Sequence, residues 1–122
     1  MEIKFFFDTY ALVEIVKGSP NYLSFAQENI TITIFNLVEL FSACLNDFGE
    51  EKAKELHNKF KVSVIEIDDE TIFEAVKFRK EHKKRNISYT DSIGYIYAKR
   101  NNFLFLTGDK EFESFPNVKF VK

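Results

Sequence analysis

The chain has 122 residues, of which 45% are hydrophobic and 16% aromatic, and it contains only two prolines and four glycines. This composition excludes a disordered or low-complexity protein, and we expect residues 1–122 to form a single domain that buries roughly two-thirds of its unfolded surface. The formal net charge of −2 argues against a nucleic-acid binder that relies on its overall charge.

The cysteine content and the apolar windows indicate a cytoplasmic protein. Cys44 is the only cysteine in the sequence, so an internal disulfide is excluded and a reducing compartment is expected. The apolar run before Asp8 is too short for a signal peptide. The most apolar window, residues 30–45, is shorter than the ~20 residues of a membrane span and contains Glu39. We therefore expect no membrane association.

The first elements are a strand followed by helical segments. Residues 2–7 predict a short buried strand, and residues 9–17 predict a helix that ends at Gly18. Ser19-Pro20 indicates the start of a further helix, because serine is a common N-cap and proline suits the first helical position.

The middle of the chain continues this alternation. The β-branched residues 30–34 (ITITI) predict a second strand, and Asn36 is expected to cap a helix that runs to about residue 47. Residues 50–60 predict a charged amphipathic helix, and residues 62–67 predict a third strand.

The last third predicts two helices and two strands. Asp68 or Asp69 caps a helix to about residue 83, and Ser88 or Thr90 starts one that ends near residue 100. The predicted strands that follow are residues 103–106 and 118–121. Strands that are apolar on both faces and alternate with helices predict a parallel sheet covered on each side, so we expect a three-layer α/β/α sandwich.

Four carboxylates fall where such a fold binds ligands, outside the carboxyl ends of its strands. Asp8 directly follows the first strand, and Asp109 follows the fourth by a short link. Glu39 and Asp91 lie in the first turns of two helices. Each acid alone is well explained as a helix cap or a turn residue. Four of them at one edge of the sheet favour a common function.

A cluster of ionised carboxylates needs a cation. Two unit charges about 4 Å apart repel by roughly 1 kcal/mol in water and by about 4 kcal/mol at an effective dielectric constant of 20. Mg²⁺ and Mn²⁺ prefer carboxylate and water ligands, and such ions activate water and stabilise charge on phosphoryl oxygens. The pattern therefore predicts metal-assisted phosphodiester hydrolysis. The hydroxyl groups of Thr107 and Thr9 are candidates to hydrogen-bond a carboxylate or a metal-bound water.

These residues resemble the PIN-domain ribonucleases and, at this chain length, the stand-alone VapC-type toxins. The resemblance spans nearly the whole chain: a strand ending in Asp8-Thr9, the segment ITIFNLVEL with Glu39, and the segment DSIGYIYAKRNNFLFLTGDKEF with Asp91 and Asp109. It implies a mainly parallel five-stranded sheet and endonucleolytic cleavage of RNA with Mg²⁺ or Mn²⁺. It also implies that the four acids bind metal with support from Thr107, and it leaves the role of Glu111 open. Homodimers and a small inhibitory antitoxin are common in this family.

A run of basic residues is a candidate contact for RNA phosphates. It consists of Lys77, Arg79, Lys80, Lys83, Lys84 and Arg85, with Lys99 and Arg100 further along. A solvated helix face is the better explanation for each of these residues taken alone. If metal ions neutralise the four site carboxylates, the formal net charge changes from −2 to +2, which is compatible with salt-sensitive RNA binding.

Two other functions remain open from the sequence. In a receiver-like signalling domain, Asp68 or Asp69 would accept a phosphoryl group, although the chain lacks an acidic pair after the first strand. A domain of the same fold that binds RNA or a partner without cutting is the other alternative.

Overall fold

The computed structural model describes residues 2–122 as five α-helices around a small sheet. The strands are β1 (Phe5–Phe7), β2 (Leu104–Thr107) and β3 (Val118–Phe120). The α-helices are α1 (Thr9–Lys17), α2 (Ile34–Phe48), α3 (Glu50–Lys61), α4 (Asp69–Glu81) and α5 (Tyr89–Arg100). Short 3-10 turns are η1 (Pro20–Tyr22), η2 (Phe25–Gln27) and η3 (Lys110–Phe112). No helix within residues 2–122 has the length and hydrophobicity needed to cross a membrane.

The sheet is parallel but has three strands among the described residues, so the expectation of five strands is not confirmed. Its order is β1-β2-β3, with Phe6 opposite Phe105 and Phe105 opposite Val118. The segments predicted as the second and third strands join only through single parallel bridges, Phe6 to Thr31 and Ile32 to Val64. The ITITI strand is cut short because α2 already begins at its last residue.

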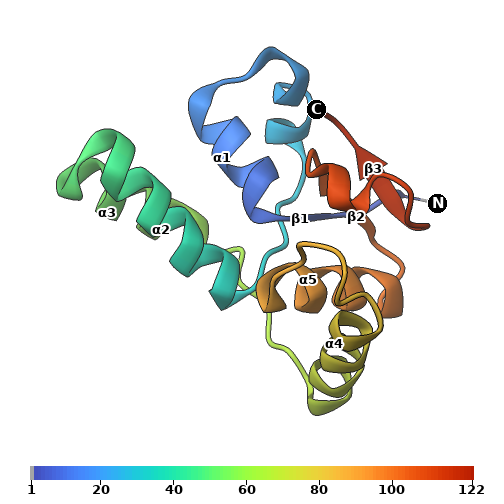
Figure 1. Cartoon of the computed structure of the whole chain (residues 1–122). Helices are drawn as coiled ribbons and strands as arrows, with labels where there is room; N and C mark the ends of the chain where they lie inside the picture. Colours follow the sequence, from blue (N-terminus) through green and yellow to red (C-terminus); the bar gives the residue numbers. More distant parts are fainter. Residues whose placement is uncertain (1) are drawn as a thin grey trace.

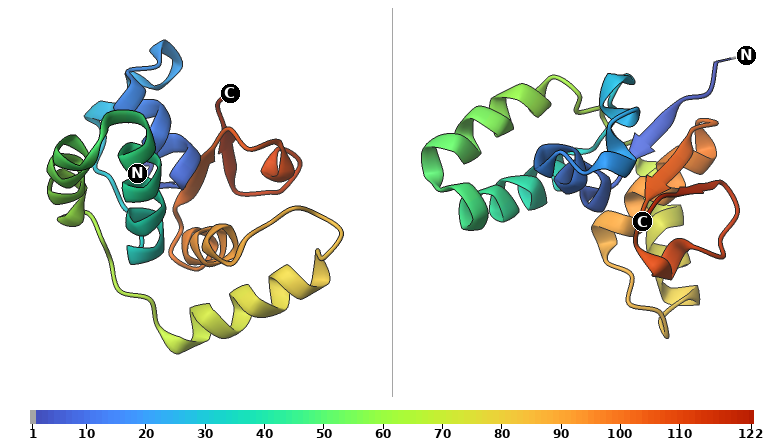
Figure 2. Two further views of the ribbon diagram at one scale, coloured as in Figure 1. Left: turned by 60° about the vertical axis from the view of Figure 1, so that its left-hand side comes forward. Right: turned by 90° about the horizontal axis from the view of Figure 1, so that it is seen from above.

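The two faces of the sheet carry separate cores, which produces the three expected layers. Neighbouring strand residues point to opposite faces, so Phe7 and Leu106 pack with α1, α2 and α3, whereas Phe6 and Phe105 pack with α4 and α5. Figure 1 shows α1 on one side of the strands and the α4–α5 pair on the other. Helices α2 and α3 form a hairpin that extends to one side (Figure 2).

The helix boundaries explain two differences from the sequence prediction. The side chain of Thr33, not that of Asn36, caps α2 by accepting a hydrogen bond from the backbone N–H of Asn36. Asn36 is therefore the third residue of the helix, and Glu39 lies in its second turn. The helix expected after Ser19-Pro20 consists only of the 3-10 turns η1 and η2. Asp68 and Ser88 cap α4 and α5 as predicted.

Helix α5 packs closely on the sheet at Gly94. A Cβ atom at this position would lie 2.6 Å from Cε1 of Phe6 and 3.2 Å from Cε1 of Phe105. Only glycine fits such an approach, since neither ring can leave the core without opening a cavity. The contact fixes how far α5 stands from the sheet, and with it the position of Asp91, one turn earlier in the helix.

Candidate active site

Asp8 is a buried carboxylate at the carboxyl end of β1. Its side chain is 2% exposed and caps α1, with Oδ1 accepting a hydrogen bond of 2.8 Å from the backbone N–H of Ala11. Its other oxygen, Oδ2, accepts a short hydrogen bond from the hydroxyl of Thr107, the last residue of the neighbouring strand β2. The Thr107 hydroxyl oxygen in turn accepts from the backbone N–H of Asp109 at 3.0 Å. One threonine therefore links two of the predicted site residues.

Burial makes the negative charge of Asp8 costly. Loss of hydration is the main reason that its pKa is raised from 3.8 to about 8, while the hydrogen bonds from Thr107 and Ala11 partly oppose the change. The charges of Asp91 and Asp109 raise the pKa further. Asp8 is thus held by two donors in a place where its charge lacks a counter-ion.

Glu39 is held by a relay of two hydrogen bonds through Thr9, the residue after Asp8. The hydroxyl of Thr9 donates to Glu39 Oε1 at 2.6 Å, and the buried Asn36 side chain donates from Nδ2 to Thr9 Oγ1 at 3.2 Å. Asn36 Oδ1 accepts from the backbone N–H and the hydroxyl of Thr33, which fixes the orientation of the amide. Thr9 thus supports a carboxylate, as the sequence suggested, whereas the sequence did not reveal this role of Asn36.

The other two acids sit at helix starts. Asp91 Oδ2 accepts from the backbone N–H of Ser88 at 3.1 Å, and Ser88 caps the helix in return, which completes a capping box. Asp109 caps η3, with Oδ1 accepting from the backbone N–H of Glu111 at 3.0 Å. The capping interpretations of Asp8 and Asp91 are therefore correct, and Asp109, interpreted as a turn residue, caps the short turn η3. The capping interpretation of Glu39 is wrong because Thr33 and Asn36 already form the box at the start of α2.

Electrostatic effects connect the four acids. Asp91 and Asp109 both raise the pKa of Asp8, and Asp109 and Glu39 both raise the pKa of Asp91, for which burial is the largest cause. Because β1 and β2 are parallel, Asp8 and Asp109 follow strands that end at the same edge of the sheet. Asp8 is therefore linked by charge to Asp91 and Asp109, and Glu39 is linked to this group through Asp91.

The rim at this edge of the sheet is not a preformed cation cage. Within residues 2–122, no three acid, histidine or cysteine side chains stand close enough together to hold a metal ion as they are. Like charges without a cation favour separation. Asp8 accepts hydrogen bonds through both of its oxygens, and each of the other three carboxylates accepts one through a single oxygen. Glu39 Oε2, Asp91 Oδ1 and Asp109 Oδ2 have no hydrogen-bond donor among the described residues. A set of carboxylate oxygens with free lone pairs fits the chemistry of Mg²⁺ or Mn²⁺.

Gly108 lets the Asp109 turn approach α1. A Cβ atom at Gly108 would lie 2.5 Å from the backbone oxygen of Val121 and closer still to the ring of Tyr10. The pKa of Tyr10 is raised by burial and by the charges of Glu14, Asp8 and Asp109. Tyr10 therefore forms part of the wall of the site, although its sequence position after Asp8-Thr9 is the only signal that could have suggested it.

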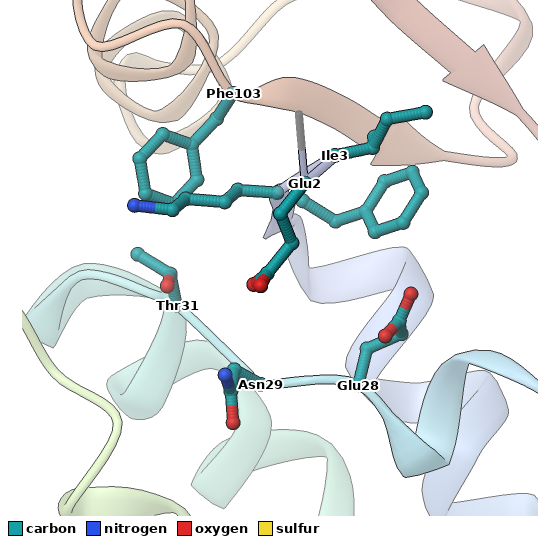
Figure 3. Close-up of a pocket in the computed structure, with 8 residues that line it drawn as sticks. Glu2, Ile3, Glu28, Asn29, Thr31 and Phe103 are labelled. Carbon is teal, nitrogen blue, oxygen red and sulfur yellow. The ribbon is translucent and has the colours of Figure 1, made fainter.

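A hollow in the surface lies away from these acids. A cavity of about 220 Å³ is lined by residues around the starts of β1 and β2: Glu2, Ile3, Lys4, Phe5, Glu28, Asn29, Thr31 and Phe103. Figure 3 shows Glu2 and Glu28 from different segments facing this hollow. Because the acids of the rim follow the opposite ends of the same strands, this hollow is not part of the candidate site.

The basic run divides into anchored and free side chains. Arg100 pairs with Glu74 at 2.7 Å, and Arg79 donates from Nε to the backbone oxygen of Ile87 at 2.9 Å. Arg85 donates to the backbone oxygen of Glu111 at 2.9 Å. The lysines of the run, by contrast, form no ion pair with residues 2–122: Lys77, Lys80, Lys83, Lys84 and Lys99.

Comparison with known proteins identifies the fold and the family. The chain matches the family model described as PIN domain over residues 5–118. Among solved structures it is similar to the DNA-bound VapBC complex of Salmonella typhimurium (18% identity, 98% of each chain, TM-score 0.74) and to a toxin–antitoxin complex of Klebsiella pneumoniae (20% identity, 95% of this chain and 96% of that chain, TM-score 0.74).

A third similar structure is the toxin VapC20 of Mycobacterium tuberculosis, which is described as cleaving the sarcin-ricin loop (15% identity, 95% of this chain and 99% of that chain, TM-score 0.75). A search of curated proteins finds no match. At these identities the solved structures show the fold, whereas the family model covers almost the whole chain. The chain belongs to the PIN-domain family.

Proposed function

We propose that the chain is a divalent-metal-dependent endoribonuclease. One observation carries this proposal: in a PIN-domain fold, Asp8 and Asp109 follow parallel strands that end at one edge of the sheet, the charges of Asp91 and Asp109 raise the pKa of Asp8, and the charges of Asp109 and Glu39 raise that of Asp91. Structural helix caps do not require such a gathering, and a bound cation would offset its electrostatic cost. Residues 1–122 constitute a single catalytic domain in this proposal.

The proposed metal ligands are Asp8, Glu39, Asp91 and Asp109, and the ion is Mg²⁺ or Mn²⁺. When bound, such an ion makes a water molecule more acidic and stabilises negative charge on a phosphoryl oxygen. Thr107 and Thr9 act by orientation, since their hydroxyls hold Asp8 and Glu39 in place. Asp8 must lose its proton to bind a cation, so metal affinity should rise with pH up to its raised pKa of about 8.

The test is a ribonuclease assay of wild type and Asp8→Asn, each with Mg²⁺, with Mn²⁺ and with EDTA. The proposal expects cutting by wild type with metal only, and loss of cutting in Asp8→Asn with the fold retained by circular dichroism. Asp47→Asn is the matched control, because Asp47 is an exposed acid in the last turn of α2. Cutting that survives EDTA would overturn the proposal.

We further propose that the chain is the toxin of a VapC-type toxin–antitoxin pair and forms a homodimer. The support is the likeness of its fold to toxin–antitoxin complexes over at least 95% of the chain. Expression of the chain should arrest growth, and co-expression of a small neighbouring reading frame should relieve the arrest. Asp8→Asn should not arrest growth. Light scattering of the purified protein tests the homodimer, and a monomer at micromolar concentration would contradict that part.

The alternatives have less support. As a receiver-like phosphoacceptor, Asp68 is poorly placed, because its side chain caps α4 at Thr71 and lies 4.0 Å from Arg100. A PIN-type domain that binds RNA without cutting is distinguished by the same ribonuclease assay.

A further inference from the structure

Tyr10 is the second residue of α1, which begins directly after Asp8 at the end of β1 (Figure 1). A Cβ atom added to Gly108 would come closest to Cε1 and Cζ of Tyr10, and Cζ is the ring carbon that carries the hydroxyl. Gly108 joins Thr107 to Asp109, so the hydroxyl end of the ring lies against the turn between these two residues. Tyr10 is thus placed on the Asp109 side of the rim.

The hydroxyl of Tyr10 is free, unlike those of two other tyrosines in the core. Tyr22 donates to the backbone oxygen of Val121, and Tyr95 donates to that of Pro116 at 2.7 Å. The Tyr10 hydroxyl forms no hydrogen bond with residues 2–122, whereas no buried side-chain oxygen or nitrogen of these residues lacks a partner. The Tyr10 hydroxyl is therefore reached by solvent, although the residue as a whole is half-buried.

The threonine hydroxyls of the rim have already used their protons. Thr9 donates to Glu39, and Thr107 donates to Asp8. The carboxylates of the rim, when ionised, can only accept hydrogen bonds. Of the hydroxyl groups of Thr9, Thr107 and Tyr10, only that of Tyr10 therefore has a proton left to donate to a ligand.

The surroundings of the Tyr10 hydroxyl are negatively charged. Burial is the largest cause of the raised pKa of Tyr10, and the charges of Glu14, Asp8 and Asp109 add to it. These charges oppose the loss of the hydroxyl proton, and they repel an anion unless a cation offsets them. The hydroxyl is thus a neutral donor that neither pairs with the acids nor adds to their charge.

We propose that the Tyr10 hydroxyl donates a hydrogen bond to a phosphate oxygen of the RNA strand bound at the rim. This inference rests on the proposed ribonuclease function and adds a contact to the substrate that carboxylates cannot make, because they have no proton to donate. A hydrogen bond to an ionised oxygen is stronger than one between neutral groups. The packing of the ring against Gly108 and Tyr22 does not need the hydroxyl, since phenylalanine would fill the same space.

Tyr10→Phe tests this contact, because it removes only the hydroxyl oxygen and keeps the ring. A labelled RNA oligonucleotide of mixed sequence is titrated with wild type and with Tyr10→Phe, and fluorescence anisotropy reports the affinity. Ca²⁺ replaces Mg²⁺, since it also takes oxygen ligands but with longer and more flexible coordination, and a gel confirms that the RNA stays intact. Tyr10→Phe should weaken RNA binding about 5-fold or more.

Tyr97→Phe is the matched control for this substitution. Tyr97 is also half-buried, its hydroxyl also forms no hydrogen bond with residues 2–122, and its ring packs on Phe103 at the start of β2, opposite to the rim. This substitution should leave RNA binding unchanged. Thermal melting should show no loss of stability in Tyr10→Phe, whereas Tyr22→Phe should melt at a lower temperature because it loses a hydrogen bond within the protein.

Mn²⁺ binding, measured by electron paramagnetic resonance, separates a substrate contact from a metal ligand. Tyr10→Phe should bind Mn²⁺ with wild-type affinity. A parallel loss of Mn²⁺ affinity would overturn the inference, as would equal RNA affinity of Tyr10→Phe and wild type, an equal loss in Tyr97→Phe, or no RNA binding by wild type.

The outcomes distinguish this inference from the proposed function. Metal-dependent cutting by wild type, together with RNA binding that does not depend on Tyr10, would leave the proposed nuclease standing and overturn the contact. RNA binding that depends on Tyr10, without any cutting, would support the contact and remove the nuclease.

Discussion

Replacing Asp8 with asparagine should stabilise the metal-free protein, although it removes a proposed metal ligand. The substitution keeps the size of the side chain and removes its charge. The amide oxygen can still accept from the backbone N–H of Ala11, and the amide nitrogen can donate to the hydroxyl of Thr107. What changes is the cost of a buried negative charge.

The size of this cost follows from the raised pKa. The carboxyl titrates at about 8 in the folded protein against an ordinary value of 3.8. Between these two values the folded state binds more protons than the unfolded state, so stability falls as pH rises. Each pH unit costs about 1.4 kcal/mol for one proton, which gives a loss on the order of 6 kcal/mol across the window. Below pH 3.8 the carboxyl group is protonated in both the folded and the unfolded state, so Asp8 no longer lowers the stability. The total stability of such a domain is only about 5–15 kcal/mol, so the effect should be large.

Urea denaturation in EDTA, at pH values between about 4 and 8, measures the effect as the difference between wild type and Asp8→Asn. Taking the difference between the two free energies of unfolding removes the contributions of all groups that titrate equally in both proteins. It should be small at the acidic end and should grow in favour of Asp8→Asn toward the alkaline end. Saturating Mg²⁺ should stabilise wild type and not the variant. Parallel stability curves in EDTA would refute the argument that Asp8 is buried without a counter-charge.

Three further substitutions test the supporting structure. Gly108→Ala should lower the free energy of unfolding by roughly 1–3 kcal/mol in urea titrations, because the added Cβ meets Tyr10 and the Val121 backbone; wild-type stability would contradict this close approach. Thr9→Val should lower the free energy of unfolding by about 1–3 kcal/mol and weaken Mn²⁺ binding, because it leaves the buried Asn36 amide without its acceptor. Thr9→Ser should keep the wild-type stability and Mn²⁺ affinity. Arg100→Met should change the free energy of unfolding by at most about 1 kcal/mol, because the ion pairs of Arg100 are exposed to solvent. A much larger loss of stability would show that solvent does not screen these ion pairs.

Local sequence patterns were sufficient for the five α-helices and for the acids that follow strands, but not for the segment after Ser19-Pro20, which forms 3-10 turns. The run FFF ends at Asp8 and the run FLFL ends near Asp109, and a parallel pair of strands places both acids at one edge. Ser88 and Asp91 form the capping box that their spacing predicts. These features depend on neighbours in the chain, which is why the sequence reveals them.

The features that the sequence did not reveal depend on competition and distance. Thr33 and Asn36 are both good caps, and the choice of Thr33 moves the helix start into ITITI and shortens that strand to a bridge. The same choice frees the Asn36 amide to reach Thr9, 27 residues away in the chain, and thereby to orient Glu39. Gly108 meets Tyr10 across an even longer separation. Contacts between residues so far apart in the chain cannot be predicted from the local pattern of apolar and polar residues.

The most direct test of the central claim is Mn²⁺ binding by electron paramagnetic resonance titration of wild type and of Asp8→Asn, Glu39→Gln, Asp91→Asn and Asp109→Asn. If the four carboxylates share one metal site, each single substitution should weaken Mn²⁺ binding at least about tenfold, and Asp47→Asn should leave it unchanged. Wild-type affinity in any of the four variants would remove that residue from the site, and wild-type affinity in all of them would contradict a metal centre at this rim.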